Sequence, residues 1–187
     1  MITQKQQQFR EGAIVKIELS KDRIVFGRLL PAFHIGVYDM IFDKVYSFSS
    51  VEDIVSYPIL FYCVIYKDVI TKGIFEIVGF KKLTQNDVRA MPPSYNQDKV
   101  NIDDCTIFHY DGRERKAQPQ ECIGLEKSSV WEAKNLIERL EDYYDGKRNM
   151  YVELFKPLLS KADPRYLPPP EALRWDFEKQ EFYRTDK

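Results

Sequence analysis

The sequence predicts an α+β fold: a strongly bent antiparallel sheet, or a partly open β-barrel, with one or two C-terminal helices. Three observations support this prediction. Residues 13–117 contain short runs rich in β-branched and aromatic side chains, separated by turn residues. One strong helical pattern follows these runs, between residues 129 and 146. Gly27 interrupts the second run, as glycine does at a bulge, a sharp bend or a close backbone approach.

The N-terminal part of the chain predicts a hairpin and a third strand. Residues 13–19 and 23–30 are alternating apolar runs on either side of Ser20-Lys21-Asp22, which indicates a β-hairpin. A further strand is expected from Phe33 to Ile41. Ser49 and Ser50 precede two acidic residues, a pattern typical of the start of a short helix, which must end before Pro58.

The middle of the chain predicts a buried strand, a long loop and a second hairpin. Residues 59–66 are apolar throughout, which favours a central, buried strand, and another strand is expected from Ile74 to Leu83. Residues 84–104 are polar and contain two adjacent prolines, so a long loop is expected. Asp111-Gly112 between two strand-like runs indicates a hairpin.

The strongest helix is expected to begin at Ser129, whose hydroxyl forms a capping box with Glu132, and to end at Gly146. A second, shorter helix is expected over residues 150–156, before Pro157. The first helix is predicted to pack on the sheet through an apolar stripe. This stripe consists of Val130, Ala133, Ile137, Leu140 and Tyr144, widened by Leu136 and Tyr143.

The domain organisation follows from a change in composition. We expect a single domain over residues 1–160, followed by a proline-rich linker and an aromatic tail over residues 161–187. Four aromatic residues of the tail, among them Trp175 and Tyr183, lie within nine positions, so we expect the tail to dock on the body or on a partner. Periodicity leaves open whether it forms a hairpin or a helix.

Composition excludes several classes of protein. The 28 basic and 29 acidic residues give a net charge of −1, which argues against wholesale nucleic-acid binding or mimicry. Three widely spaced cysteines indicate reduced thiols and not a disulfide framework. The polar N-terminus has no signal-peptide core, and no apolar run is long enough to span a membrane. A cytoplasmic location is therefore expected.

The sequence contains no convincing catalytic site. Its two histidines, His34 and His109, are too few for the usual three or four ligands of a zinc site. Cys105 and His109 would lie about 13 Å apart along a strand, too far to share a metal ion. Asp39 and Asp43 are expected to flank a turn, and the nucleophile-elbow and phosphate-loop motifs are absent. We therefore predict no catalytic residue, no metal and no cofactor.

A partner-binding surface is the better hypothesis. Glu138, Asp142 and Asp145 lie away from the apolar stripe of the strong helix and would form an acidic patch for a basic partner. A merely solvated helix face is the alternative interpretation. Trp175 and Tyr183 of the tail are candidate anchors, because Trp and Tyr are enriched at binding hot spots.

Several motifs, in order, resemble the immunity protein 26 family of bacterial polymorphic toxin systems. The motifs are Phe26-Gly27-Arg28-Leu29-Leu30, Pro58 with Leu60-Phe61, Gly73 with Phe75 and Ile77, and Glu121-Cys122-Ile123-Gly124-Leu125-Glu126 followed by Val130-Trp131 and Arg139-Leu140. The resemblance covers roughly residues 9–150; Phe75 stands where Trp is expected, and the aromatic tail looks like an addition.

The resemblance implies an immunity protein that binds a cognate toxin and blocks it by occupying it. Two alternatives remain. One is a small β-barrel binding module for another protein or for nucleic acid. The other is a hydrolase of the phosphotriesterase type, an activity attached to some relatives, which two histidines do not support because such enzymes need a larger metal cluster.

Overall fold

A computed structural model describes residues 7–167, 173–176 and 181–184. The chain divides into two compact units, which are described separately below. Unit 1 combines the N-terminal 92 residues with residues 128–153, and unit 2 combines residues 93–127 with the C-terminal segment from residue 154. The prediction that residues 1–160 behave as one domain stays a prediction.

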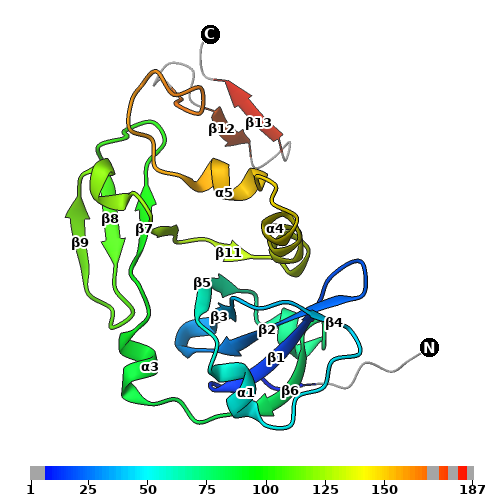
Figure 1. Ribbon diagram of the computed structural model, residues 1–187. Coiled ribbons are helices and arrows are strands. Elements are labelled where there is room, and N and C mark those ends of the chain that lie inside the picture. The colour runs from blue at the N-terminus through cyan, green and yellow to red at the C-terminus, as the bar shows by residue number, and fades with distance from the viewer. Residues whose placement is uncertain (1–6, 168–172, 177–180, 185–187) are drawn as a thin grey trace. The chain divides into compact units, whose positions relative to one another are not determined.

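Unit 1 contains a seven-stranded sheet built on the predicted hairpin (Figure 1). The hairpin strands are β1 (Ala13–Glu18) and β2 (Arg23–Leu29), joined by a tight turn in which Lys21 and Asp22 both have positive φ. The order is β11-β5-β3-β2-β1-β6, and the short β4 also pairs with β2. The remaining bounds are β3 His34–Tyr38, β4 Phe42–Asp43, β5 Ile59–Ile65, β6 Glu76–Phe80 and β11 Val130–Trp131.

The sheet is open and almost entirely antiparallel, which confirms the predicted α+β class. Only the pair β5–β11 is parallel, and β6 and β11 end the order without pairing with each other. The register shifts between Ile14 and Val15 and between Val37 and Tyr38. Gly27 pairs with Val15 and with Val37, each of which borders one of these irregularities. A Cβ at Gly27 would lie 2.6 Å from Cδ1 of Ile35, so the Ile35 side chain on the neighbouring strand occupies the space that a larger residue would need.

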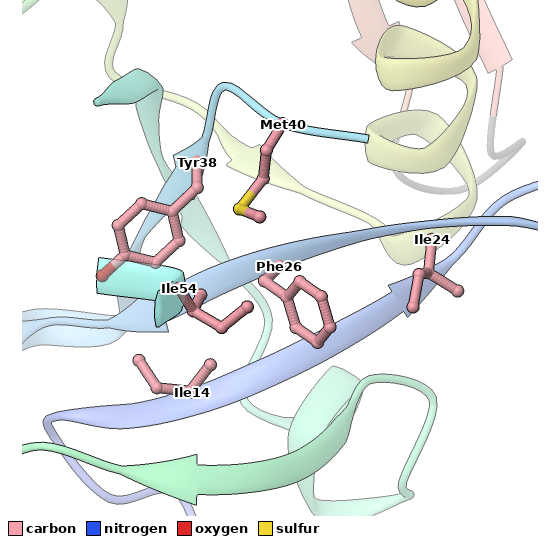
Figure 2. Packing of buried hydrophobic residues seen from close by; sticks show 6 residues of the cluster. All are labelled: Ile14, Ile24, Phe26, Tyr38, Met40 and Ile54. Atoms are coloured by element: carbon pink, nitrogen blue, oxygen red, sulfur yellow. The ribbon is translucent and has the colours of Figure 1, made fainter. Parts of the chain in front are cut away.

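One face of this sheet, which we call the α1 face, carries a hydrophobic cluster covered by helix α1 (Val51–Val55). Figure 2 shows its six most buried members, with Ile54 of α1 facing Phe26 of β2. The helix begins at Ser50, whose side chain accepts a hydrogen bond from Glu52 N while Asp53 bonds back to Ser50 N, as the capping pattern predicts. Several aromatic residues between β3 and α1 pack around the same cluster.

The opposite face, which we call the α4 face, is covered by helix α4 (Ala133–Tyr144). Because paired residues share a face, Gly27, Val37 and Phe61 lie on this side. The guanidinium of Arg139 lies 3.7 Å from the ring centre of Phe61, which places α4 here. Leu136 and Leu140 are fully buried beside it.

Two expectations about these elements are wrong. The helix begins at Ala133 and not at Ser129, because Val130 and Trp131 pair with Val64 and Ile65 as strand β11. The strand over residues 59–66 is not central: β5 is next to the end of the order, β11 covers only two of its residues, and only Cys63 and Ile65 of the strand are buried. The end at Gly146, whose φ is +68°, agrees with the prediction.

Three short helical turns complete unit 1: η1 (Pro31–Phe33), α2 (Asp68–Thr71) and α3 (Gln85–Arg89). The helix α3 falls inside the predicted long loop and begins at Thr84, which forms a capping box with Asp87. Asp87 also accepts a hydrogen bond from buried Arg28, whose other amino group donates to the carbonyls of Lys81 and Lys82. Arg28 therefore fixes α3 to the sheet.

Unit 2 contains a four-stranded sheet in the order β10-β7-β8-β9 (Figure 1). Its strands are β7 Ser94–Gln97, β8 Cys105–Phe108, β9 Glu114–Ala117 and β10 Glu126–Lys127, and η2 (Pro119–Cys122) precedes β10. The hairpin β8–β9 turns at Asp111-Gly112, as predicted. The strand β7 again corrects the predicted loop: Pro92-Pro93 precedes it, but Tyr95 and Gln97 point into the core.

Gln97 attaches the C-terminal segment to this sheet. Its Nε2 donates to the carbonyls of Ile102 and Leu158, and its Oε1 accepts from Leu158 N. The hydroxyl of Tyr95 donates to the carbonyl of Phe155, at the end of α5 (Met150–Phe155). The tail forms an antiparallel hairpin of β12 (Leu173–Asp176) and β13 (Glu181–Arg184), which decides between the two predicted forms. Where the tail docks lies outside the described residues.

Candidate partner-binding surface

Of the three acidic residues predicted on the strong helix, Glu138 is the one that faces solvent. Asp142 is half-buried, and its Oδ2 accepts a hydrogen bond from Nδ2 of Asn149 at 2.9 Å. Asn149 is buried and its Oδ1 accepts from the backbone amides of Tyr151 and Val152, so it caps α5. Asp142 therefore orients the residue that starts the next helix.

Asp145 lies in a cluster of basic side chains. Lys21 Nζ and Arg23 Nη1 each lie 2.8 Å from its carboxylate, and Lys147 Nζ lies at 3.3 Å. Hydrogen bonds from Lys21, Arg23 and Lys147 hold the pKa of this carboxyl well below its ordinary value. One turn earlier, Glu141 Oε1 accepts a hydrogen bond from Ser20 N at 2.6 Å. These contacts fasten the tip of the β1–β2 hairpin to the end of α4.

The three predicted acids therefore do not form one free patch. The structure places Glu138 beside Glu141 on the rim of a groove that runs along the first turns of α4. Two adjoining hollows, of about 400 Å³ and about 600 Å³, make up this groove, which we call the α4 groove. They share Ile74, Ala133 and Lys134, so they are continuous.

The lining of the α4 groove is apolar and partly exposed. Ile74, in the loop before β6, is 45% exposed, and Tyr66, before α2, is 50% exposed. Ala133 and Ile137 supply the helix side. Carboxylates surround this lining: Asp68 and Glu132 around one hollow, Glu138 and Glu141 around the other. An apolar centre with a charged rim is the usual arrangement of a protein-binding surface.

Sequence reasoning missed most of this groove. Ala133 and Ile137 were assigned to the apolar stripe of the helix core, whereas Leu136, Arg139 and Leu140 are its buried residues. Val130 and Tyr143, also placed in the stripe, are 47% and 48% exposed. The sequence predicts Tyr66 and Ile74 as the ends of two strands, residues 59–66 and 74–83, whereas in the structure both lie just outside β5 and β6.

A third hollow, of about 520 Å³ and separate from the α4 groove, lies beside the loop that contains β4. Phe42 and Tyr46 stack there with ring centres 3.8 Å apart, and Val45 at the tip of the loop is 92% exposed. Tyr144 closes one side, where its hydroxyl donates to the carbonyl of Met40. Burial raises the pKa of Tyr144 to about 12, so this hydroxyl remains a donor at neutral pH.

The residues considered for chemistry are scattered. His34 contacts the carbonyl of Pro31 through Nδ1 at 2.9 Å, and the backbone of His109 closes the β8–β9 hairpin. Cys105 and Cys122 are buried in the core of unit 2. In the part of the chain that the structure describes, no group of three or more His, Cys, Asp or Glu side chains is placed to hold a metal ion. None of the described helices is long and apolar enough to cross a membrane.

Trp175 and Tyr183, the predicted anchors of the tail, lie on β12 and β13. Their backbones pair with Phe182 and Arg174, respectively. The positions of their side chains lie outside the described residues. Their role in partner binding stays a prediction.

The fold is an open sheet covered by helices, and it presents an apolar groove with a charged rim. This arrangement is typical of a protein-binding domain. The family model of immunity protein 26 matches residues 10–106, slightly more than half of the 187 residues. The chain belongs to the immunity protein 26 family. The matched residues include every strand of the unit 1 sheet except β11, while α4 and the motifs from Glu121 to Leu140 follow the match. No curated protein and no solved structure matches the chain.

Proposed function

We propose that this protein neutralises a cognate bacterial toxin by binding it in a fixed ratio and occupying its working surface. The family membership carries the proposal, because an immunity protein implies a toxin as its partner. The α4 groove supplies a surface of suitable chemistry, with an apolar lining and a rim of carboxylates. Inhibition by occupancy needs neither a nucleophile nor a cofactor.

The proposed interface is centred on Glu138 and the α4 groove. Asp142 and Asp145 contribute indirectly, since their carboxylates hold Asn149 and the β1–β2 hairpin in place. Trp175 and Tyr183 remain the proposed anchors of the tail, because large aromatic side chains supply most of the binding energy at many interfaces. We propose that the complex forms in the cytoplasm.

A titration tests the proposal. A candidate toxin domain, sought among the products of the neighbouring genes, is assayed while the protein is added in increasing amounts. We expect residual toxin activity to fall linearly and to reach its minimum at a fixed molar ratio. Exhaustive dialysis against a chelator is expected to leave the titration unchanged. The contrary result is inhibition that increases with time when the protein is present at a small fraction of the toxin concentration. That result would indicate enzymatic turnover and would contradict occupancy.

A further inference from the structure

We infer that the α4 groove receives an apolar side chain carried on a cationic segment of the partner. This inference rests on the proposed function and adds the chemistry of the segment that is recognised. Ala133 is the key residue, because its methyl group lines both hollows of the groove at the first residue of α4. A larger side chain at this position would fill the space that the two hollows share.

The apolar part of the groove determines what is buried. Tyr66 and Ile74 lie on one side and Ile137 on the other, so a side chain entering beside Ala133 has apolar neighbours on both sides. Covering Tyr66 and Ile74, each about half exposed, removes apolar area from water and so favours binding. Val69, which also lines the groove, is already buried and fixes its floor.

The rim determines the charge of the partner. Four carboxylates, those of Asp68, Glu132, Glu138 and Glu141, line the groove with Lys134 as its only lining base among the described residues. Lys72 pairs with Asp68 at 2.8 Å, so the groove and this neighbour together carry four negative and two positive charges. Because the whole chain carries only −1, the negative charge is a local property of this surface.

These charges decide between possible occupants. A nucleic acid brings phosphates that the four carboxylates repel, and it offers no aliphatic side chain for the hollow beside Ala133. A segment with Lys or Arg on either side of an apolar residue satisfies both parts of the groove. Lys134, on the groove side of α4, is placed to repel a cation at the centre, so the cations belong over the rim and the apolar side chain over the centre.

Two synthetic peptides provide a direct probe. The first is an amphipathic helix of Lys and Leu, and the second is the same peptide with each Lys replaced by Glu. Amide chemical shifts of the isotope-labelled full chain are followed during each titration. We expect the Lys peptide to shift the amides around Ala133, Ile137 and Ile74, and the Glu peptide to leave them unchanged. Equal shifts with both peptides, or shifts confined to other surfaces, would overturn the inference.

Two substitutions test the groove itself. Ala133→Trp fills the shared space, and Ile74→Ser removes part of the apolar lining without filling it. Each substitution is expected to weaken binding of the Lys peptide by at least about tenfold in Kd, which corresponds to about 1.4 kcal/mol. Val45→Ser is the matched control, because it removes an exposed aliphatic side chain from the other hollow and should leave peptide binding unchanged. A thermal midpoint equal to that of the parent shows that a variant is folded. If Ala133→Trp does not fold, Ile74→Ser alone tests the groove.

The toxin titration separates this inference from the proposed function. If the parent protein inhibits the toxin and both groove variants inhibit it equally well, the inference is wrong and the proposed function stands. If the Lys peptide binds in the groove but the parent protein does not inhibit the toxin, the proposed function fails while the preference of the groove for a cationic apolar segment stands. Self-association of the chain that Ile74→Ser abolishes would assign the groove to a second copy and overturn the inference.

Discussion

Asp145 is the residue whose role the sequence and the structure describe most differently. Its position near the end of a helix, away from the apolar stripe, indicated a free acidic side chain. In the folded protein its side chain is 15% exposed, and its carboxylate contacts Lys21 and Arg23. Those partners lie 124 and 122 positions away in the chain, so spacing within the helix gives no indication of them. Glu138 is exposed, as its position away from the apolar stripe indicates.

The depressed pKa of Asp145 predicts how the stability of the fold depends on pH. A carboxyl whose folded pKa lies below its unfolded value stabilises the fold when it is ionised, and this stabilisation is lost as the pH falls through the folded pKa. The ordinary value is 3.8, so the loss begins as the pH drops below about 4. Asp145→Asn should lower the thermal midpoint at pH 7. As the pH falls, the parent loses the same stabilisation, so the difference in thermal midpoint between parent and variant should become smaller. Identical pH profiles would show that the ion pairs contribute nothing.

Gln97 is a second residue whose role depends on distant partners. Leu158 lies 61 positions away, and Gln97 satisfies both its amide and its carbonyl. Gln97→Leu leaves these buried groups and the carbonyl of Ile102 without the amide. Each of these three groups costs about 1–3 kcal/mol when it is left unpaired, so we expect a loss of at least about 3 kcal/mol in the free energy of unfolding, measured with denaturant. Asn96→Leu makes a similar change on the exposed side of β7 and should have little effect.

At the scale of elements, local signals predicted most of unit 1 and failed where tertiary contacts decide. The first hairpin, the Ser50 cap and the Asp111-Gly112 turn depend on neighbouring residues, and all three are present. The predicted buried face of α4 differs from the observed one because Arg139 counts as polar in a hydrophobicity pattern. Its guanidinium nevertheless stacks on Phe61 and lies 5.0 Å from the ring centre of Trp131. A single sequence carries no sign of such a contact.

The strand β7 was missed for a similar reason. Its four residues, Ser94–Gln97, include two amides, and two prolines precede them, which is the composition of a loop. A strand forms because Tyr95 and Gln97 both find backbone carbonyl acceptors inside unit 2. Buried polar side chains with satisfied hydrogen bonds are the residues that pattern-based prediction assigns to the surface.

The corrected orientation of α4 predicts which substitutions matter. Leu136 is fully buried, whereas Ile137 is half-buried on the wall of the groove. Leu136→Ala should cost about 2–5 kcal/mol of unfolding free energy, and Ile137→Ala roughly 1 kcal/mol, because a partly exposed side chain loses less packing. Denaturant unfolding of the two variants measures the difference. A larger loss for Ile137→Ala than for Leu136→Ala would show that Ile137 belongs to the buried face of α4, as the sequence predicts.

At the scale of the whole molecule, charge is nearly balanced while its distribution is not. A net charge of −1 produces little long-range attraction for a toxin, so any electrostatic steering must come from local surfaces such as the rim of the α4 groove. The Debye length is about 10 Å at 0.1 M salt, which limits the reach of that rim to the last part of the approach. The composition alone therefore argued against nucleic-acid mimicry but gave no location for a partner.

Reversing the free carboxylates of the rim tests this local steering. Glu132→Lys combined with Glu138→Lys changes two exposed side chains that the structure does not use to hold α4 in place, unlike Glu141 and Asp145. We expect association with the cognate toxin to slow by about three- to tenfold at low salt, and by less at high salt, because screening removes the field that the substitutions reverse. Stopped-flow association rates at two ionic strengths measure the effect, with Glu114→Lys on the exposed strand β9 as the control. An association rate and a salt dependence equal to those of the parent would place the interface away from α4, since a reversal of four charge units at a contact surface cannot leave both unchanged.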